Sequence, residues 1–266
     1  MLGLGASLST QAAVAPYLEL SELNNYADLD IHFDFSALTG INGAEIAAAT
    51  NLATGAGTPS NYNITSNSGT PLLDTVTMGL PSIAFDGSDE VLNMAAAYTT
   101  TNKAFTFFIV LQRGDVSNDY TIASASASVT DVPDDYIRLM AEGGTVNIAL
   151  ENQAVVAIVT DSTAGTTTSY EAQESINMLY VIRRTTAGNT FIYADYGILI
   201  GSKTSTAMKA GATLELGRIG GTEEGDLADL TGNIGEIGVY DVALSSANSI
   251  VLAQELSKKW GITRDS

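Results

Sequence analysis

The chain has 266 residues but no cysteine, one histidine, one tryptophan and few basic residues. Without cysteine there are no disulfides, thiolate metal sites or cysteine nucleophiles, so stability has to come from the core or from assembly. Only 11 lysine and arginine residues stand against 30 aspartate and glutamate residues, which gives a net charge of −19. Binding to phosphate backbones needs a basic face, so we expect no nucleic-acid partner.

The sequence also lacks long apolar runs. No stretch approaches the roughly 20 apolar residues that cross a bilayer, so we expect no membrane insertion. The first 16 residues are small and mildly apolar, but they lack the basic start and the continuous apolar stretch of a signal peptide. We therefore expect synthesis in the cytoplasm of a host cell without a signal peptide.

What is present is typical of a globular β protein. Hydrophobic residues make up 45% of the chain and charged residues 15%, which excludes a disordered acidic tail. The length fits one large β domain. We expect residues 1–40 to form an N-terminal arm with the first strand, and residues 41–266 to form the main domain.

Short strands separated by turn residues recur along the chain. Residues 104–112 are apolar on both faces, which is typical of a central strand. Gly143–Gly144 and Thr185–Asn189 each lie between two β-rich segments and predict hairpins. About a dozen such strands with one helix favour an all-β fold of two antiparallel sheets packed face to face.

The closing segment, residues 232–262, combines a strand with a helix. Its first half alternates, and this period of two places Gly235, Ile237 and Val239 on one face and Ile234, Glu236, Gly238 and Tyr240 on the other. From Ser245 or Ser246, leucines and Trp260 recur every four residues, and Gly261 follows two lysines. These signals predict a short C-terminal helix with Trp260 in the core.

Two segments carry a family resemblance. Gly232–Ser245 resembles the closing strand of concanavalin A-like (laminin G-like, lectin/glucanase) jelly-roll domains, and Ile83–Leu92 resembles their early F-D-G-x-D-x-L strand and turn. The resemblance covers roughly residues 80 to 262. It implies an antiparallel β-sandwich of the jelly-roll type with one short C-terminal helix. It leaves activity open, because this fold hosts lectins, hydrolases and structural modules.

The resemblance also implies candidate binding residues. Related domains hold Ca²⁺ with acids in loops, and the candidates here are Asp86, Asp89, Asp226 and Asp229, with a further cluster at Asp131, Asp134 and Asp135. Aspartate is equally the ordinary turn residue, so we expect no cofactor, with Ca²⁺ as the one candidate ion. A saccharide groove would use Glu236 with Tyr240, and Tyr196 is a further candidate for stacking. The alternative for Glu236 is a structural acid that hydrogen-bonds within the sheet.

The matches to known catalytic motifs are poor. Jelly-roll glucanases carry E-x-D-x-x-E on one strand, and the nearest match, Glu224, Asp226 and Asp229, ends in aspartate within a glycine-rich segment. His32 is the only base available for a serine triad, and no nucleophile elbow surrounds it. We therefore expect no enzymatic activity.

These observations lead to three hypotheses. The first is a structural protein of a bacteriophage virion, in the capsid decoration, tail or fibre, because the opening MLGLGASLS is similar to those of tailed-phage structural proteins. Such a protein would form homo-oligomers and bind other virion proteins through an arm with Leu2, Leu4, Leu8 and Val14 as its apolar contacts. The second is a lectin-like module that binds cell-surface glycans. The third is a jelly-roll glycoside hydrolase.

Overall fold

The computed structural model describes residues 28–55, 57–101, 104–114, 120–124, 135–142, 145–152, 155–158, 175–203, 214–221 and 229–263. These residues form two antiparallel sheets and one α-helix, α2 (Ser246–Lys259), with two short 3-10 helices, η1 (Phe35–Ala37) and η2 (Pro59–Tyr62). No helix in this part of the chain is long and apolar enough to cross a membrane. The arm residues Leu2, Leu4, Leu8 and Val14 lie outside the described residues.

The first sheet has eight strands. In spatial order they are β13 (Ile198–Lys203), β12 (Thr190–Ala194), β11 (Asn177–Arg184), β6 (Phe105–Arg113), β15 (Thr231–Tyr240), β4 (Ser82–Asp86) and β3 (Leu72–Asp74), and β1 (Leu29–Asp34) also pairs with β15. β1, the first strand among the described residues, is thus part of the sandwich.

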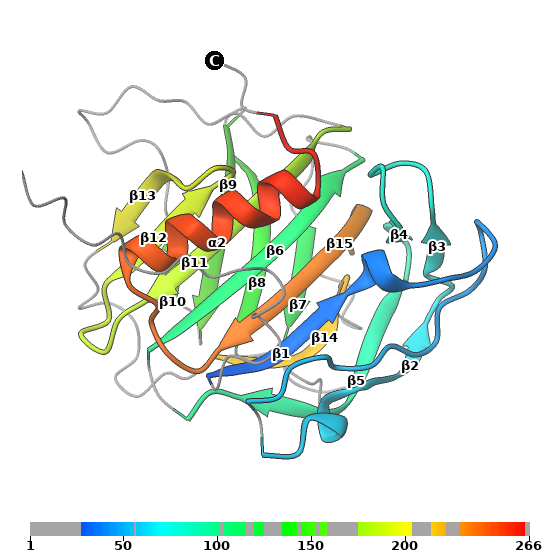
Figure 1. Cartoon of the computed structure of the whole chain (residues 1–266), viewed down its shortest axis with the longest axis horizontal. Helices are drawn as coiled ribbons and strands as arrows, with labels where there is room; N and C mark the ends of the chain where they lie inside the picture. Colours follow the sequence, from blue (N-terminus) through cyan, green and yellow to red (C-terminus); the bar gives the residue numbers. More distant parts are fainter. Residues whose placement is uncertain are drawn as a thin grey trace, which may run out of the picture.

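The second sheet has seven strands and lies behind the first (Figure 1). In order they are β10 (Val155–Ile158), β9 (Thr145–Asn152), β8 (Asp135–Glu142), β7 (Tyr120–Ser124), β14 (Glu215–Ile219), β5 (Val91–Thr99) and β2 (Ile64–Ser68). The predicted hairpins are β8–β9 and β11–β12. The antiparallel β-sandwich with one C-terminal helix is therefore confirmed.

The first sheet is buried on both faces. Its inner face packs against the second sheet, with Phe107 and Ile109 of β6 meeting Leu92 and Leu216 in one hydrophobic cluster. Its outer face carries Phe108 and other apolar residues that pack under α2, and the helix lies across β6, β11 and β12 (Figure 1). Every residue of β6 is buried as a result, which confirms the prediction of a central strand.

Helix α2 begins and ends where the sequence predicts. The Ser245 side chain accepts a hydrogen bond from the Asn248 N–H and caps the first turn. At the other end the Ile262 N–H donates to the Ser257 carbonyl at 2.9 Å, and the Gly261 N–H donates to the Lys258 carbonyl at 3.3 Å. This is a Schellman motif, and Gly261 adopts the positive φ of 60° that it requires.

A β-bulge at Gly235 alters the predicted faces of β15. The register to β6 shifts between Ile234 and Glu236, so one extra residue stands on β15. Ile234 therefore faces the inner core with Ile237 and Val239, and Gly235 faces the helix. The prediction that Ile234 lies on the face of Glu236, and Gly235 on that of Ile237, is wrong because a bulge interrupts the period of two.

Gly235 gives the first testable prediction. A Cβ atom at this position would lie 2.4 Å from the Trp260 ring. Gly235→Ala should destabilise the fold by about 1–3 kcal/mol, because the buried indole has to move. Urea unfolding measures the change. Gly57→Ala is the matched control, since a Cβ there meets nothing within 4 Å; an equal loss in both variants would contradict the assigned contact.

Candidate functional site: a carboxamide cleft at the end of the helix

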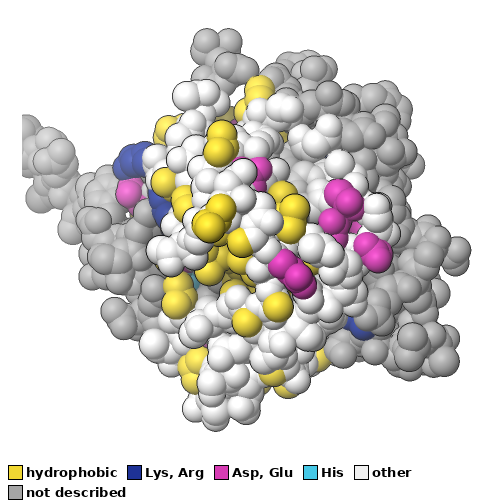
Figure 2. All heavy atoms as spheres, turned by 90° about the vertical axis from the view of Figure 1, so that its right-hand side faces the viewer, with side chains coloured by type: hydrophobic (Ala, Val, Ile, Leu, Met, Phe, Trp, Pro, Cys, Tyr) yellow, Lys and Arg dark blue, Asp and Glu magenta, His cyan; other side chains and the backbone are white. Residues whose placement is uncertain are grey.

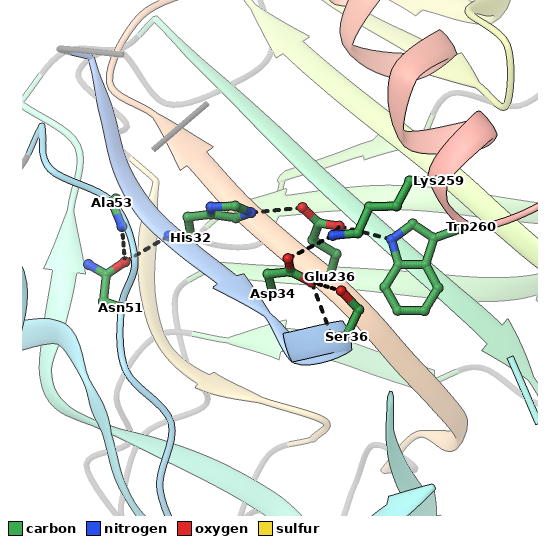
Figure 3. Close-up of polar contacts among 8 residues, drawn as sticks. All are labelled: His32, Asp34, Ser36, Asn51, Ala53, Glu236, Lys259 and Trp260. Atoms are coloured by element: carbon green, nitrogen blue, oxygen red, sulfur yellow. Dashed lines mark hydrogen bonds and ion pairs between the residues drawn. The ribbon is translucent and has the colours of Figure 1, made fainter. Parts of the chain in front are cut away.

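A buried carboxylate joins the first strand to the end of the helix (Figure 3). Glu236 on β15 is 1% exposed. Its Oε1 lies 2.8 Å from His32 Nε2 on β1. Its Oε2 accepts hydrogen bonds from Lys259 Nζ at 2.6 Å and from the Trp260 indole Nε1 at 2.8 Å. Three donors from two distant segments thus converge on one carboxylate.

The surroundings keep this carboxylate ionised. Burial alone would raise the pKa of Glu236, but the hydrogen bonds from His32 and Lys259 and the charge of Lys259 outweigh burial and hold the pKa below its usual value. Lys259 also pairs with Asp34 Oδ2 at 2.7 Å. Asp34 Oδ1 in turn accepts from the Ser36 N–H and hydroxyl. The helix end is therefore tied to both β1 and β15.

Two of the three predicted sugar-binding residues, Glu236 and Tyr240, are buried. Glu236 is enclosed by the cluster just described, and Tyr240 is 0% exposed beneath the helix, with its ring 6.2 Å from that of Phe108. Neither side chain can reach a saccharide, and Glu236 acts as the structural acid that was the alternative. Tyr196 is half-buried in the turn between β12 and β13, and its contact with sugar stays a prediction.

Of the acidic candidates for Ca²⁺, the structure describes Asp86, Asp89 and Asp229. Asp86 is the last residue of β4, where its N–H donates to Glu90 Oε2 at 2.5 Å and its Oδ1 accepts from the Ser88 N–H. Asp229 is 8% exposed before β15. Among the residues that the structure describes, no three His, Cys, Asp or Glu side chains are placed to hold a metal ion. Asp226, Glu224, Asp131 and Asp134 lie outside those residues, as does the side chain of Asp135.

An open cleft of about 640 Å³ lies beside the C-terminal end of α2. Three segments besides the helix end form it: the loop after β3, the end of β6 and the start of β11. Its lining is Val76, Thr77, Met78, Gly79, Leu80, Gln112, Ser175, Ile176, Asn177, Lys259, Trp260, Gly261, Ile262 and Thr263. Val76 is 71% exposed and Ile176 39% exposed at its rim, so the cleft offers both polar groups and aliphatic surface.

Three carboxamides stand in one row at this end of the sheet. Gln112 on β6 is the register partner of Asn177 on β11 and of Asn233 on β15. All three side chains lie on the outer face, because Phe108 and Val110 precede Gln112 on that face. The row follows the last apolar residues that the helix covers.

The row is held in place, and one member keeps free hydrogen-bonding capacity. Asn177 Nδ2 donates to the carbonyls of Met78 and Trp260, both at 2.9 Å, and its Oδ1 accepts from Gln112 Nε2 at 3.3 Å. Gln112 makes no other side-chain bond to a described residue, although it is only 7% exposed. Its Oε1 and one Nε2 hydrogen thus remain available at the wall of the cleft.

Sequence reasoning missed this site. The available signal was a polar residue, Gln112, at the end of an apolar outer row on a central strand. Asn177 is held by two carbonyls that come from other parts of the chain. A local sequence pattern cannot predict such distant partners.

The structure is similar to solved β-sandwich domains with low sequence identity. One is domain 4 of AbnA, an extracellular GH43 arabinanase from Geobacillus stearothermophilus, solved in complex with arabinotriose. Its TM-score is 0.54 at 14% identity, over 85% of this chain and 98% of that domain. Another is the native heptameric SAP-like pentraxin from Limulus polyphemus, with a TM-score of 0.52 at 17% identity over 65% of this chain and 81% of the pentraxin chain.

A third similar structure is Trypanosoma rangeli sialidase in complex with sialic acid, with a TM-score of 0.56 at 11% identity. It is matched over 90% of this chain but over only 34% of the sialidase. The fold is a jelly-roll β-sandwich of the concanavalin A type. No protein-family model and no curated protein matches the sequence.

Two adjacent lysines test the buried cluster. Lys259→Met should cost about 3 kcal/mol of unfolding free energy, because it leaves the charge of the buried Glu236 undercompensated. Lys258→Met is the matched control, since Lys258 is 61% exposed and pairs with Glu255 within the helix; its cost should stay below about 1 kcal/mol. Urea unfolding followed by the fluorescence of Trp260, the single tryptophan, gives both values. Similar costs would mean that Lys259 does not compensate Glu236.

Glu90 predicts a dependence of stability on pH. Burial, followed by the hydrogen bond with the Asp86 side chain, raises the pKa of Glu90 from 4.5 to about 7. The neutral acid is thus favoured in the folded state, and its contribution is complete below pH 4.5 and lost as the pH rises through 7. The unfolding free energy should fall by up to about 3 kcal/mol between pH 5 and pH 8.

Glu90→Gln is the control for this effect, because an uncharged amide preserves the shape of the protonated acid. The difference between the wild type and this variant removes the contribution of the chain's net charge, which also changes with pH. Thermal unfolding at pH 5 and pH 8 measures it. Equal slopes for the two proteins would show that the pKa of Glu90 is not raised.

Proposed function

We propose that this chain is a non-catalytic, lectin-like module that binds carbohydrate in the cleft beside Gln112. The observation that carries the proposal is the carboxamide of Gln112, which is nearly buried, fixed by Asn177 and still able to donate and accept one hydrogen bond at the cleft wall. A carboxamide of this kind matches two neighbouring hydroxyl groups of a sugar, one as donor and one as acceptor.

The remaining lining suits the same ligand class. The volume of about 640 Å³ falls within the range of small-molecule sites. The hydroxyls of Thr77, Ser175 and Thr263 add polar contacts, and Val76 and Ile176 offer aliphatic surface for the apolar face of a sugar ring. Trp260 is 2% exposed, so binding would not use tryptophan stacking.

The lining also supports binding without catalysis. Canonical glycoside hydrolysis needs two carboxyl groups on either side of the scissile bond. Among the described residues that line this cleft, none is an aspartate or a glutamate. The nearby acids Asp34 and Glu236 are engaged with Lys259, and Glu236 is enclosed. The similar domain of the arabinanase was solved with arabinotriose, which is consistent with carbohydrate recognition on this fold.

The virion hypothesis concerns context and is compatible with glycan binding. It depends on the arm of residues 1–16, which lies outside the described residues. Display on a bacteriophage particle, homo-oligomer formation and contacts with other virion proteins therefore remain predictions from the sequence. A hydrolase that uses Glu224, Asp226 and Asp229 is not the function we propose.

A substitution at Gln112 tests the proposal. Gln112→Leu keeps the volume of the side chain but removes its hydrogen-bonding groups, and it should weaken binding to a responsive oligosaccharide by tenfold or more, roughly 1.4 kcal/mol. A glycan array with the wild type identifies the oligosaccharide, and calorimetry compares the variants. Gln254→Leu is the matched control, because Gln254 is half-buried on α2 and outside the cleft. Unchanged affinity in Gln112→Leu would exclude the cleft as the binding site.

A further inference from the structure

We infer that the cleft selects neutral glycans and rejects glycans that carry a carboxylate. This inference rests on the proposed function, and it comes from the charges that surround the cleft.

Lys259, the one cation among the described lining residues, is already neutralised. Lys259 Nζ lies 2.7 Å from Asp34 Oδ2 and 2.6 Å from Glu236 Oε2. One ammonium group thus faces two carboxylates, which leaves this wall with a formal charge of −1. A sugar carboxylate that approached Lys259 would have to displace one of these partners or bring a third negative charge.

A further carboxylate, that of Asp74, holds the loop of Val76 and Thr77, which also lines the cleft. Asp74 Oδ1 accepts from the N–H groups of Val76 and Thr77, and Asp74 Oδ2 accepts from Thr77 Oγ1 and Asn233 Nδ2. Although burial opposes it, this set of hydrogen bonds holds the pKa of Asp74 below its usual value. This loop is therefore shaped by a negative charge, and no described residue pairs Asp74 with a cation.

The helix end adds to the same field. Gly261, Ile262 and Thr263 follow the last turn of α2 and line the cleft, so the negative end of the helix dipole points toward it. The wider surface is also acidic, since the chain carries −19. Seen from the side of β2, β3 and β4, acidic side chains lie across the face and basic ones only at its margins (Figure 2).

The groups that remain for a ligand are uncharged. Gln112 offers a carboxamide oxygen and one N–H, and the lining adds hydroxyl groups from Thr77, Ser175 and Thr263. Such groups recognise sugar hydroxyls without a charge on the ligand. Each negative charge near the cleft leaves the binding of a neutral sugar nearly unaffected but opposes an acidic one.

Matched pairs of oligosaccharides test this inference. The probes are lactose with 3′-sialyllactose, and galactotriose with trigalacturonate; arabinotriose serves as an additional neutral probe. Binding to the full chain at pH 8 and low salt is followed by NMR, through the side-chain amide signals of Gln112 and Asn177. In every pair that responds, the acidic member should bind about fivefold or more weakly than the neutral one. The ratio should shrink in 0.5 M salt, because salt screens the repulsion.

A gain of charge provides the second arm. Thr263→Lys adds a cation at an exposed position of the lining and should reduce the discrimination at low salt, whereas the uncharged variant Thr263→Gln should not. The inference is overturned if the acidic member of a pair binds as well as the neutral one. It is also overturned if the ratio of the two affinities changes neither with salt nor in Thr263→Lys. In both cases glycan binding in the cleft would still hold. If no probe, neutral or acidic, moves the two amide signals, the proposed function fails and the inference with it.

Discussion

The burial of one ionised carboxylate governs how the two ends of the described chain come together. Glu236 is sealed between β15 and the last turn of α2, and a buried charge without partners would be prohibitively costly. Its partners come from β1 and from the end of the helix, so the carboxylate is satisfied only when both are in place. Helix docking also buries the apolar outer face of the first sheet. The polar cluster and the apolar face therefore require the same arrangement, and the bulge at Gly235 makes room for the indole that connects them.

The same arrangement builds the cleft. Trp260 donates its indole N–H to Glu236, and its backbone carbonyl accepts a hydrogen bond from Asn177. Asn177 in turn fixes the loop at Met78 and orients Gln112. The wall of the cleft is thus attached to the buried cluster through Trp260, and Lys259, which also lines the cleft, binds Glu236 as well. A site fixed in this way loses little conformational entropy when a ligand binds, which favours affinity in a cleft whose described lining has no exposed aromatic ring.

Local patterns predicted much of the fold and little of the site. The central strand β6, the two hairpins and both caps of α2 follow from residues adjacent in sequence, and the structure confirms each of them. The pairing of His32 with Glu236 joins residues 204 positions apart, and it depends on a strand order that alternation does not reveal. The bulge at Gly235 was not predicted for a related reason, because the need for a small residue there arises from the Trp260 ring that packs against it. A binding role for Gln112 was not predicted, because a glutamine at the end of a strand is common and its spatial neighbours are not evident from the sequence.

The position of the carboxamide row favours a role in ligand binding over contact with solvent alone. On the outer face of the first sheet, α2 covers the apolar rows, so a binding site on this face has to lie where the strands extend beyond the helix. If the side chains of this row contacted only water, they would be exposed, and charged residues would be as suitable there as amides. Here Gln112 and Asn233 are each 7% exposed, and Asn233 is fully engaged as a donor with Asp74 and Ser82. The Oε1 and the second Nε2 hydrogen of Gln112 face the cleft without a partner among the described residues. A ligand that enters the cleft can replace water at these two groups, and sugar hydroxyls are suited to do so.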